Sequence, residues 1–270
     1  MTDFRTNTPP VVLSIAGSDS SSGAGIQADL KSITANGAYA CTAITAVTAQ
    51  NTQGVTHITP LDTSIVAAQI DAIFNDFNVS SVKIGMLATP EITQVVIDKL
   101  IQYHAKNIVV DPILLSTKGQ VLLSEAAITL CKNKLFPFSV LVTPNLPEFY
   151  ALSISNDIKI ERDILNLALT TFGCEWLLVK GGHSDDEKYC TDILVHTSGV
   201  YSITSPRITS MNTHGTGCTL SSAIATYLAH GQNMLDSVTK AKHYLSDCLL
   251  RAQNQRLGSG CGPLDHFILN

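Results

Sequence analysis

Residues 211–231 join a glycine-rich turn directly to a strongly amphipathic helical segment. Gly215, Thr216, Gly217 and Cys218 stand at the junction, and the apolar residues after them recur at the spacing of one helical face. The first N–H groups of a helix have no partner within it, and they lie at the positive end of the helix dipole. Glycine also lets a ligand approach the backbone closely. The turn is therefore suited to binding an anion, above all phosphate.

Cys218 falls in the first turn of this expected helix. There the same N–H groups and dipole are expected to lower the pKa of a thiol and make it a better base or nucleophile. The same residues also fit a tight turn followed by a small buried cysteine. Both interpretations are compatible with the local pattern.

The composition indicates an ordinary globular protein. With 270 residues, of which 45% are hydrophobic and 14% charged, the chain can form one large core, and we expect a single domain over residues 1–270. A net charge of -5 without a Lys/Arg cluster argues against a nucleic-acid partner. Charged residues interrupt nearly every apolar stretch, so no membrane span is expected. Without a signal-peptide pattern or C-x-x-C spacing, the seven cysteines favour free thiols in the cytoplasm.

Apolar runs suited to buried parallel strands alternate with segments of helical periodicity along the chain. Two short alternating runs flank Thr197, Ser198 and Gly199 and predict a hairpin. Repeated strand–helix units indicate an α/β fold with a mainly parallel sheet and helices on both faces. The expected strands are residues 11–16, 41–49, 82–85, 107–110, 140–142, 176–179, 191–195 and 200–203, and the expected helices are 26–36, 64–74, 91–103, 124–134, 164–172, 216–230 and 234–253.

The loop after the first expected strand imitates a dinucleotide fingerprint. Residues 23–28 satisfy G-x-G-x-x-G/A. That fingerprint needs its first glycine at the strand end and an acidic residue about 20 positions later. Here six residues separate Ala16 from Gly23, and residues 40–50 contain no acid. We therefore exclude a Rossmann site, and no P-loop consensus occurs either.

Polar residues follow the ends of several expected strands. In a parallel sheet these ends share one edge, where ligands bind. Carboxylates and amides there could hold Mg²⁺, a lysine could neutralise nucleotide phosphates, and the 215–218 turn could cradle developing charge. Each residue alone has an ordinary structural explanation, but their common position favours phosphoryl transfer. The set is Asp19, Gln50, Asp111, Asn145, Glu148 and Lys180.

Seven motifs in order along nearly the whole chain carry a family resemblance. They are IAGSD at 15–19, GAGIQADLK at 23–31, AQNT at 49–52, KIGML at 83–87, TPNLPE at 143–148, KGGH at 180–183 and THGTGCT at 213–219. This pattern resembles the hydroxymethylpyrimidine/phosphomethylpyrimidine kinases of thiamine biosynthesis, which belong to the ribokinase-like superfamily. The resemblance implies a three-layer α/β/α sandwich, usually a homodimer. It also implies phosphorylation of 4-amino-5-hydroxymethyl-2-methylpyrimidine and then of its monophosphate, with ATP as co-substrate and Mg²⁺.

The resemblance also assigns roles to single residues. Gln50 would hydrogen-bond the aminopyrimidine, in a pocket lined by Gly17, Asp29 and Met86. Asn145 and Glu148 would organise Mg²⁺ and phosphate, with Asp111 as a second metal-binding carboxylate. Lys180 and Thr216 would approach the ATP phosphates. The 215–218 turn, including Gly215 and Gly217, would form the anion hole. Cys218 would take the proton of the attacking hydroxyl, where most of the superfamily has aspartate.

Three departures from the family pattern affect loops around the expected pocket. Ser20 and Ser22 replace a proline and a glycine, and Thr48 stands where an aliphatic residue is usual. Near 111–119, Lys118 is moved by one place. These changes bear on loop closure, affinity and the second phosphorylation more than on the reaction class.

Two other functions fit parts of the pattern. A pyridoxal/pyridoxine kinase of the same cysteine-bearing branch shares the Gly-Cys helix start, but Gln50 argues against it because a pyridoxal ring lacks the amino group to be recognised. A non-catalytic pyrimidine or nucleotide sensor would not need the acids, the lysine and Cys218 together. Mg²⁺-dependent ATP consumption would separate a kinase from a sensor.

Overall fold

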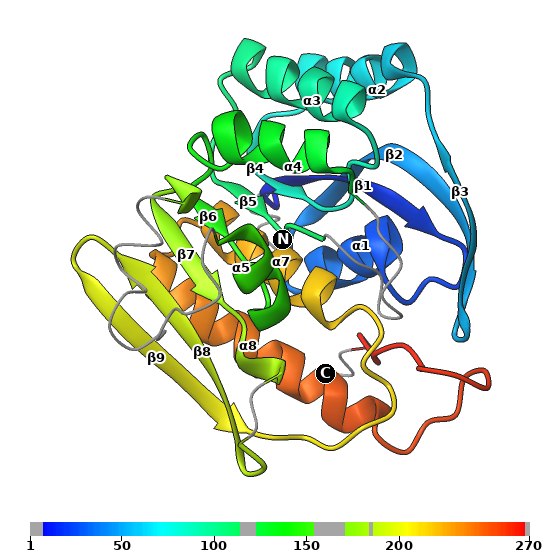
Figure 1. Cartoon of the computed structure of the whole chain (residues 1–270), viewed down its shortest axis with the longest axis vertical. Coiled ribbons are helices and arrows are strands. Elements are labelled where there is room, and N and C mark those ends of the chain that lie inside the picture. Colours follow the sequence, from blue (N-terminus) through cyan, green and yellow to red (C-terminus); the bar gives the residue numbers. More distant parts are fainter. Residues whose placement is uncertain (1–7, 114–122, 154–170, 184–185, 268–270) are drawn as a thin grey trace, which may run out of the picture.

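The computed structural model describes residues 8–113, 123–153, 171–183 and 186–267. Within them, nine strands form one sheet in the order β3-β2-β1-β4-β5-β6-β7-β8-β9, covered by helices on both faces (Figure 1). This confirms the expected α/β fold. None of the described helices combines the length and apolar character of a membrane span.

The centre of the sheet is parallel, as expected. Neighbouring strands pair in parallel from β2 through β1, β4, β5 and β6 to β7. Leu13 and Val12 on β1 pack into the cores on opposite faces, and both are fully buried. A strand buried on both faces requires such an uninterrupted apolar run. The parallel strands are β1 (Val11–Asp19), β2 (Tyr39–Asn51), β4 (Val79–Ile84), β5 (Ile108–Val110), β6 (Leu141–Val142) and β7 (Trp176–Val179).

The antiparallel strands lie at the two edges of the sheet. β8 (Tyr189–His196) and β9 (Gly199–Pro206) form the expected hairpin. β3 (Gly54–Pro60) pairs with β2 and was not expected. No residue of β3 is buried, so it lacks the apolar alternation by which a strand is recognised in sequence.

Helices pack in two layers (Figure 1). One face carries α1 (Gly25–Ala35), α7 (Thr216–Ala229) and α8 (Met234–Ala252). The other carries α2 (Thr63–Asp76), α3 (Pro90–Gln102), α4 (Glu125–Leu130) and α5 (Leu146–Leu152), with a π-turn at Cys131–Leu135 after α4. A further short 3₁₀ turn is Gly181–His183. The sequence pattern did not predict α5. The expected helix 164–172 lies largely outside the described residues.

Candidate active site

Lys180 and Asp111 meet at the carboxyl edge of the sheet. Asp111 directly follows β5 and Lys180 directly follows β7, and Lys180 Nζ lies 2.6 Å from Asp111 Oδ1. A Cβ atom on Gly217 would lie 3.1 Å from Asp111 Oδ2 and 3.3 Å from Lys180 Nζ. Burial would lower the pKa of Lys180, but Asp111 and Glu148 outweigh it and raise the pKa. The charged ammonium of Lys180 therefore lies next to Gly217 in the first turn of α7.

Asn145 and Glu148 form a reciprocal cap at the start of α5. The Asn145 side-chain oxygen accepts from the Glu148 N–H, and Glu148 Oε2 accepts from the Asn145 N–H, both at 2.8 Å. This capping box explains why a helix begins directly after β6. Asn145 also pairs with Lys180 as an isolated parallel bridge. The expected metal-organising pair thus lies beside the lysine.

Glycines bring the start of α7 against the loop that follows β1. Gly215 precedes α7 with φ +86°, and a Cβ there would run into the Gly23 carbonyl oxygen. Thr216 is the first residue of α7 and is half-buried. Gly25 has φ +58° and lies against the Gly17 carbonyl oxygen. These positions require glycine because backbone meets backbone.

Cys218 is buried, and its thiol differs from the sequence expectation. Burial raises the pKa of Cys218 to about 11, although Lys83 and the Gly25 N–H each favour the thiolate. Asp29 and Asp111 raise the pKa further. The expected lowering of the pKa by the helix start is therefore wrong. The loss of solvation destabilises the buried thiolate more than the N–H groups and the helix dipole stabilise it.

Lys83 and Asp29 form a fully buried ion pair beneath Cys218. Lys83 Nζ lies 2.8 Å from Asp29 Oδ1, and neither side chain is exposed. Ser14 and Ser222 donate hydrogen bonds to the same carboxylate at 2.6 and 2.7 Å. Asp29, expected to line the pocket, thus reaches no open surface here. The sequence pattern did not predict this ion pair, although a lysine inside an apolar strand was the available signal.

Gly17 and Met86 lie together, as the resemblance implied. A Cβ on Gly17 would overlap the terminal methyl of Met86. The Thr45 hydroxyl donates to the Met86 carbonyl at 2.6 Å and fixes the loop after β4. Because Gly25 lies against the Gly17 carbonyl oxygen and its N–H bonds to Cys218, Gly17 lies close to the start of α7.

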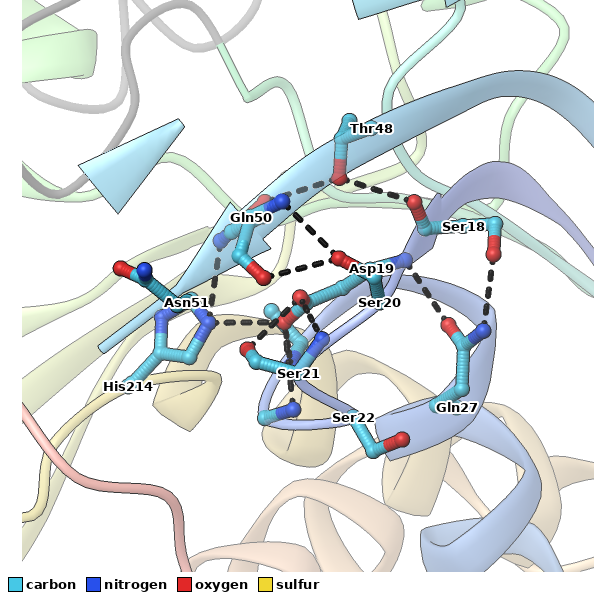
Figure 2. A network of polar contacts seen from close by, with 12 residues as sticks. Ser18, Asp19, Ser20, Ser21, Ser22, Gln27, Thr48, Gln50, Asn51 and His214 are labelled. Atoms are coloured by element: carbon cyan, nitrogen blue, oxygen red, sulfur yellow. Dashed lines mark hydrogen bonds and ion pairs between the residues drawn. The ribbon is translucent and has the colours of Figure 1, made fainter. Parts of the chain in front are cut away.

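A polar network surrounds Gln50 near the end of β2 (Figure 2). Its side-chain amide contacts Thr48 Oγ1 at 3.2 Å and His214 Nε2 at 3.1 Å. His214 Nε2 also lies 2.8 Å from Asp19 Oδ2. Ser20 Oγ accepts from the Gln50 N–H at 2.9 Å and contacts the Gln50 carbonyl at 2.8 Å. His214 was not among the predicted site residues, despite its place in the THGTGCT motif.

The departures at Ser20, Ser22 and Thr48 have structural counterparts in this network. Ser20 uses its hydroxyl to hold the Gln50 backbone, which a proline could not do. Ser22 has φ +62°, a conformation that favours the glycine usual in the family. Thr48 donates to the Ser18 carbonyl at 2.9 Å, which ties β2 to the end of β1. The expected position of Lys118 lies outside the described residues.

Comparisons with known proteins identify the family of this chain. Residues 19–265 match the model of the family described as phosphomethylpyrimidine kinase. A hydroxymethylpyrimidine/phosphomethylpyrimidine kinase from Escherichia coli (strain K12) is 44% identical over 94% of this chain and 96% of its own length.

Solved structures of two activities resemble the fold. A phosphomethylpyrimidine kinase from Clostridium difficile 630 has a TM-score of 0.77 at 38% identity, over 88% of this chain and 98% of its own. A Bacillus subtilis pyridoxal kinase, solved as an ADP complex, has a TM-score of 0.84 at 30% identity, over 96% and 97%. The backbone of this chain is thus similar to solved structures of both kinases. Its sequence identity is higher to the two pyrimidine kinases, at 44% and 38%, than to the pyridoxal kinase, at 30%. With the family match over residues 19–265, the chain belongs to the phosphomethylpyrimidine kinase family.

Proposed function

We propose that this protein transfers the terminal phosphate of ATP to 4-amino-5-hydroxymethyl-2-methylpyrimidine and then to its monophosphate. One observation carries the proposal: two consecutive residues of α7 contact two separate groups of the expected site residues. Gly217 touches the Asp111–Lys180 ion pair, and Cys218 touches Gly25, which borders the Gly17–Met86 pocket. A phosphate and a small alcohol bound on either side would therefore meet at one helix start.

The start of α7 is proposed to stabilise the transferred phosphoryl group. The N–H groups of residues 215–218 form the anion hole, and Lys180 neutralises the phosphates of ATP. Thr216 is the first residue of α7, and its N–H also donates to the Thr213 carbonyl at 3.3 Å. Such positioned donors act mainly on charge that develops in the transition state.

Asp111 and Glu148 are the proposed Mg²⁺ ligands. Both carboxylates are buried and both raise the pKa of Lys180, which contacts Asp111 at 2.6 Å and pairs with Asn145, the capping partner of Glu148. Among the described residues no group of three His, Cys, Asp or Glu side chains is arranged to hold a metal. Mg²⁺ needs only one or two carboxylates and completes its shell with water and substrate phosphates. When bound, the ion would neutralise phosphate charge.

Cys218 is the proposed acceptor of the hydroxymethyl proton. Its thiol is mostly protonated at neutral pH because burial raises its pKa to about 11. Lys83 lies close enough to favour the thiolate, and the Asp29 carboxylate holds the Lys83 ammonium. We propose that Asp29 acts on the pocket through Lys83, and that Gln50, Gly17 and Met86 contact the pyrimidine.

We propose one kinase domain over residues 1–270 and a homodimer, both from the family resemblance. All seven cysteines are free, which supports the reducing cytoplasm as the compartment. Light scattering of the purified protein would test the dimer.

Pyridoxine kinase activity is the second candidate, favoured by the TM-score of 0.84 to the Bacillus subtilis pyridoxal kinase. The deciding experiment offers Mg-ATP with hydroxymethylpyrimidine, its monophosphate or pyridoxine, and separates the products by chromatography. Conversion of the first two to the diphosphate supports the proposal, and turnover of pyridoxine alone overturns it. Removal of Mg²⁺ with EDTA should abolish transfer, and added Mg²⁺ should restore it.

A further inference from the structure

His214 contacts both the loop after β1 and the side chain of Gln50. Its Nε2 atom lies 2.8 Å from Asp19 Oδ2 and 3.1 Å from the nearest amide atom of Gln50 (Figure 2). His214 and Asp19 are both buried. A single ring nitrogen therefore faces a carboxylate and an amide at once.

The Asp19 carboxylate determines the role of that nitrogen. It accepts hydrogen bonds from the Ser21 hydroxyl and from backbone N–H groups at Ser21, Gly23 and Ala24, at 2.7 to 3.1 Å. Although burial raises the pKa of Asp19, the bonds from His214, Ser21 and the loop N–H groups lower it to about 2. An ionised carboxylate can only accept. His214 Nε2 must therefore carry a hydrogen and donate it.

This assignment fixes the direction of the Gln50 amide. Figure 2 places the amide nitrogen on the His214 side, which would set two N–H groups against each other. The two ends of an amide have nearly the same shape, and their hydrogen-bond partners decide between them. If Asp19 Oδ2 and the Gln50 amide share the one Nε2 hydrogen, the amide oxygen faces His214 and the NH₂ group turns toward Thr48 Oγ1. Thr48 gives its hydrogen to the Ser18 carbonyl, so its oxygen is able to accept.

We propose that His214, held by Asp19, positions the Gln50 amide and thereby sets which heterocycle the site accepts. The inference rests on the proposed function, in which Gln50 contacts the pyrimidine. With its oxygen on the His214 side, the outer edge of the amide offers an acceptor and a donor in a fixed order.

That order matches a ring with an amino group beside an unprotonated nitrogen. The ring cannot turn over to fit a reversed amide, because its hydroxymethyl group must point toward Cys218. A 4-oxo analogue, which has a carbonyl beside a ring N–H, presents the opposite order. Each mismatch would leave a polar group of the site unpaired, which is how enzymes reject analogues strongly.

The test compares kcat/KM for the 4-amino compound and its 4-oxo analogue. The decisive pair of variants is His214→Gln, which keeps a donor near the Nε2 position, and His214→Met, which does not. We expect the amino-to-oxo preference of the wild type to fall about tenfold or more in His214→Met, mostly through KM, as one lost hydrogen bond implies. His214→Gln should keep most of the preference.

Gln27→Ala is the matched control for loosening of the loop. Gln27 accepts from the Asp19 N–H at 2.9 Å and donates to Ser18 Oγ at 2.8 Å, but no contact joins it to the Gln50 amide in Figure 2. Its loss should change the rates for both compounds alike and leave their ratio unchanged. If His214 acts through Gln50, the double variant Gln50→Ala/His214→Met should show the same amino-to-oxo preference as Gln50→Ala alone.

The outcomes separate two failures. A wild type that does not phosphorylate the 4-amino compound overturns the proposed function itself. A wild type that does so, with the same preference in His214→Met, overturns only the positioning role of His214. An equal fall in preference in Gln27→Ala would also overturn it, since the loop alone would then explain the effect. If His214→Met does not fold, His214→Ala serves as the donor-free variant under the same criteria.

Discussion

Asp111 and Lys180 come from strands that are not neighbours, yet their side chains meet at 2.6 Å directly above Gly217. β6 separates the two strands, and the ion pair bridges its carboxyl end. The first turn of α7 lies so close that a Cβ at residue 217 would require these side chains to shift by a few tenths of an ångström. This contact links the proposed metal- and phosphate-binding residues to the helix start that also carries Cys218.

Gly217→Ala should therefore disturb the reaction more than the fold. The new Cβ would press on the Asp111 carboxylate and the Lys180 ammonium at 3.1 and 3.3 Å. We expect kcat/KM to fall about tenfold to a hundredfold, while stability stays within about 1 kcal/mol because alanine favours helix. Gly182→Ala is the control, since a Cβ there meets nothing within 4 Å. Equal kinetics of both variants would contradict the close contact.

The pH dependence of the rate should report Cys218. With a thiol pKa raised to about 11, the thiolate fraction grows roughly tenfold per pH unit below that value. If the thiolate takes the proton, kcat/KM should rise from about pH 7 to pH 10. Cys218→Ala should lower kcat by about 10² or more.

Cys218→Asp provides the sharper test of the same role. A carboxylate is already ionised at neutral pH, so this variant should retain more activity than Cys218→Ala and lose the alkaline rise. Rates are measured across the pH range with saturating Mg-ATP. A rise of equal slope in the wild type and Cys218→Asp would assign it to another group.

The buried Lys83–Asp29 pair should matter for stability as well as chemistry. Lys83→Met leaves the Asp29 charge uncompensated, and we expect a loss of about 3–5 kcal/mol in the free energy of unfolding. Lys83→Met/Asp29→Asn should recover part of that loss. Lys99→Met is the control, because the Lys99–Asp71 pair is partly exposed and should contribute about 1 kcal/mol or less. Urea denaturation measures all three, and equal losses at both sites would contradict the argument.

Asp19 should make stability depend on acidity. Its pKa is about 2 in the folded protein against an ordinary 3.8, so between these values only the unfolded chain binds the proton. Stability from this group is then fully present above about pH 4 and lost as the pH falls through 2. Asp19→Asn should be less stable by about 1–2 kcal/mol near neutral pH, allowing for solvent screening, and equal to the wild type near pH 2. A constant difference in urea midpoint across this range would refute the linkage.

Much of the architecture followed from local pattern. Apolar runs such as 11–16 and 176–179 are buried on both faces of a parallel sheet, and their spacing by helical segments predicted the layers. Because parallel strands end at one edge, the sequence also placed Asp111 and Lys180 together, and the structure brings them into contact. The Gly-Thr-Gly-Cys turn predicted the helix start at Thr216.

Other features depended on groups that are distant in sequence. The pKa of Cys218 is decided by burial under neighbours from β4, α1 and β5, which outweighs the helix start on which the sequence argument relied. Asp29 is fully buried, and Lys83, 54 residues away, binds its carboxylate. The direction of the Gln50 amide depends on His214, 164 residues away. Sequence spacing determined which residues reach the edge of the sheet, whereas desolvation and partner geometry, which exist only after folding, decided their charge and orientation.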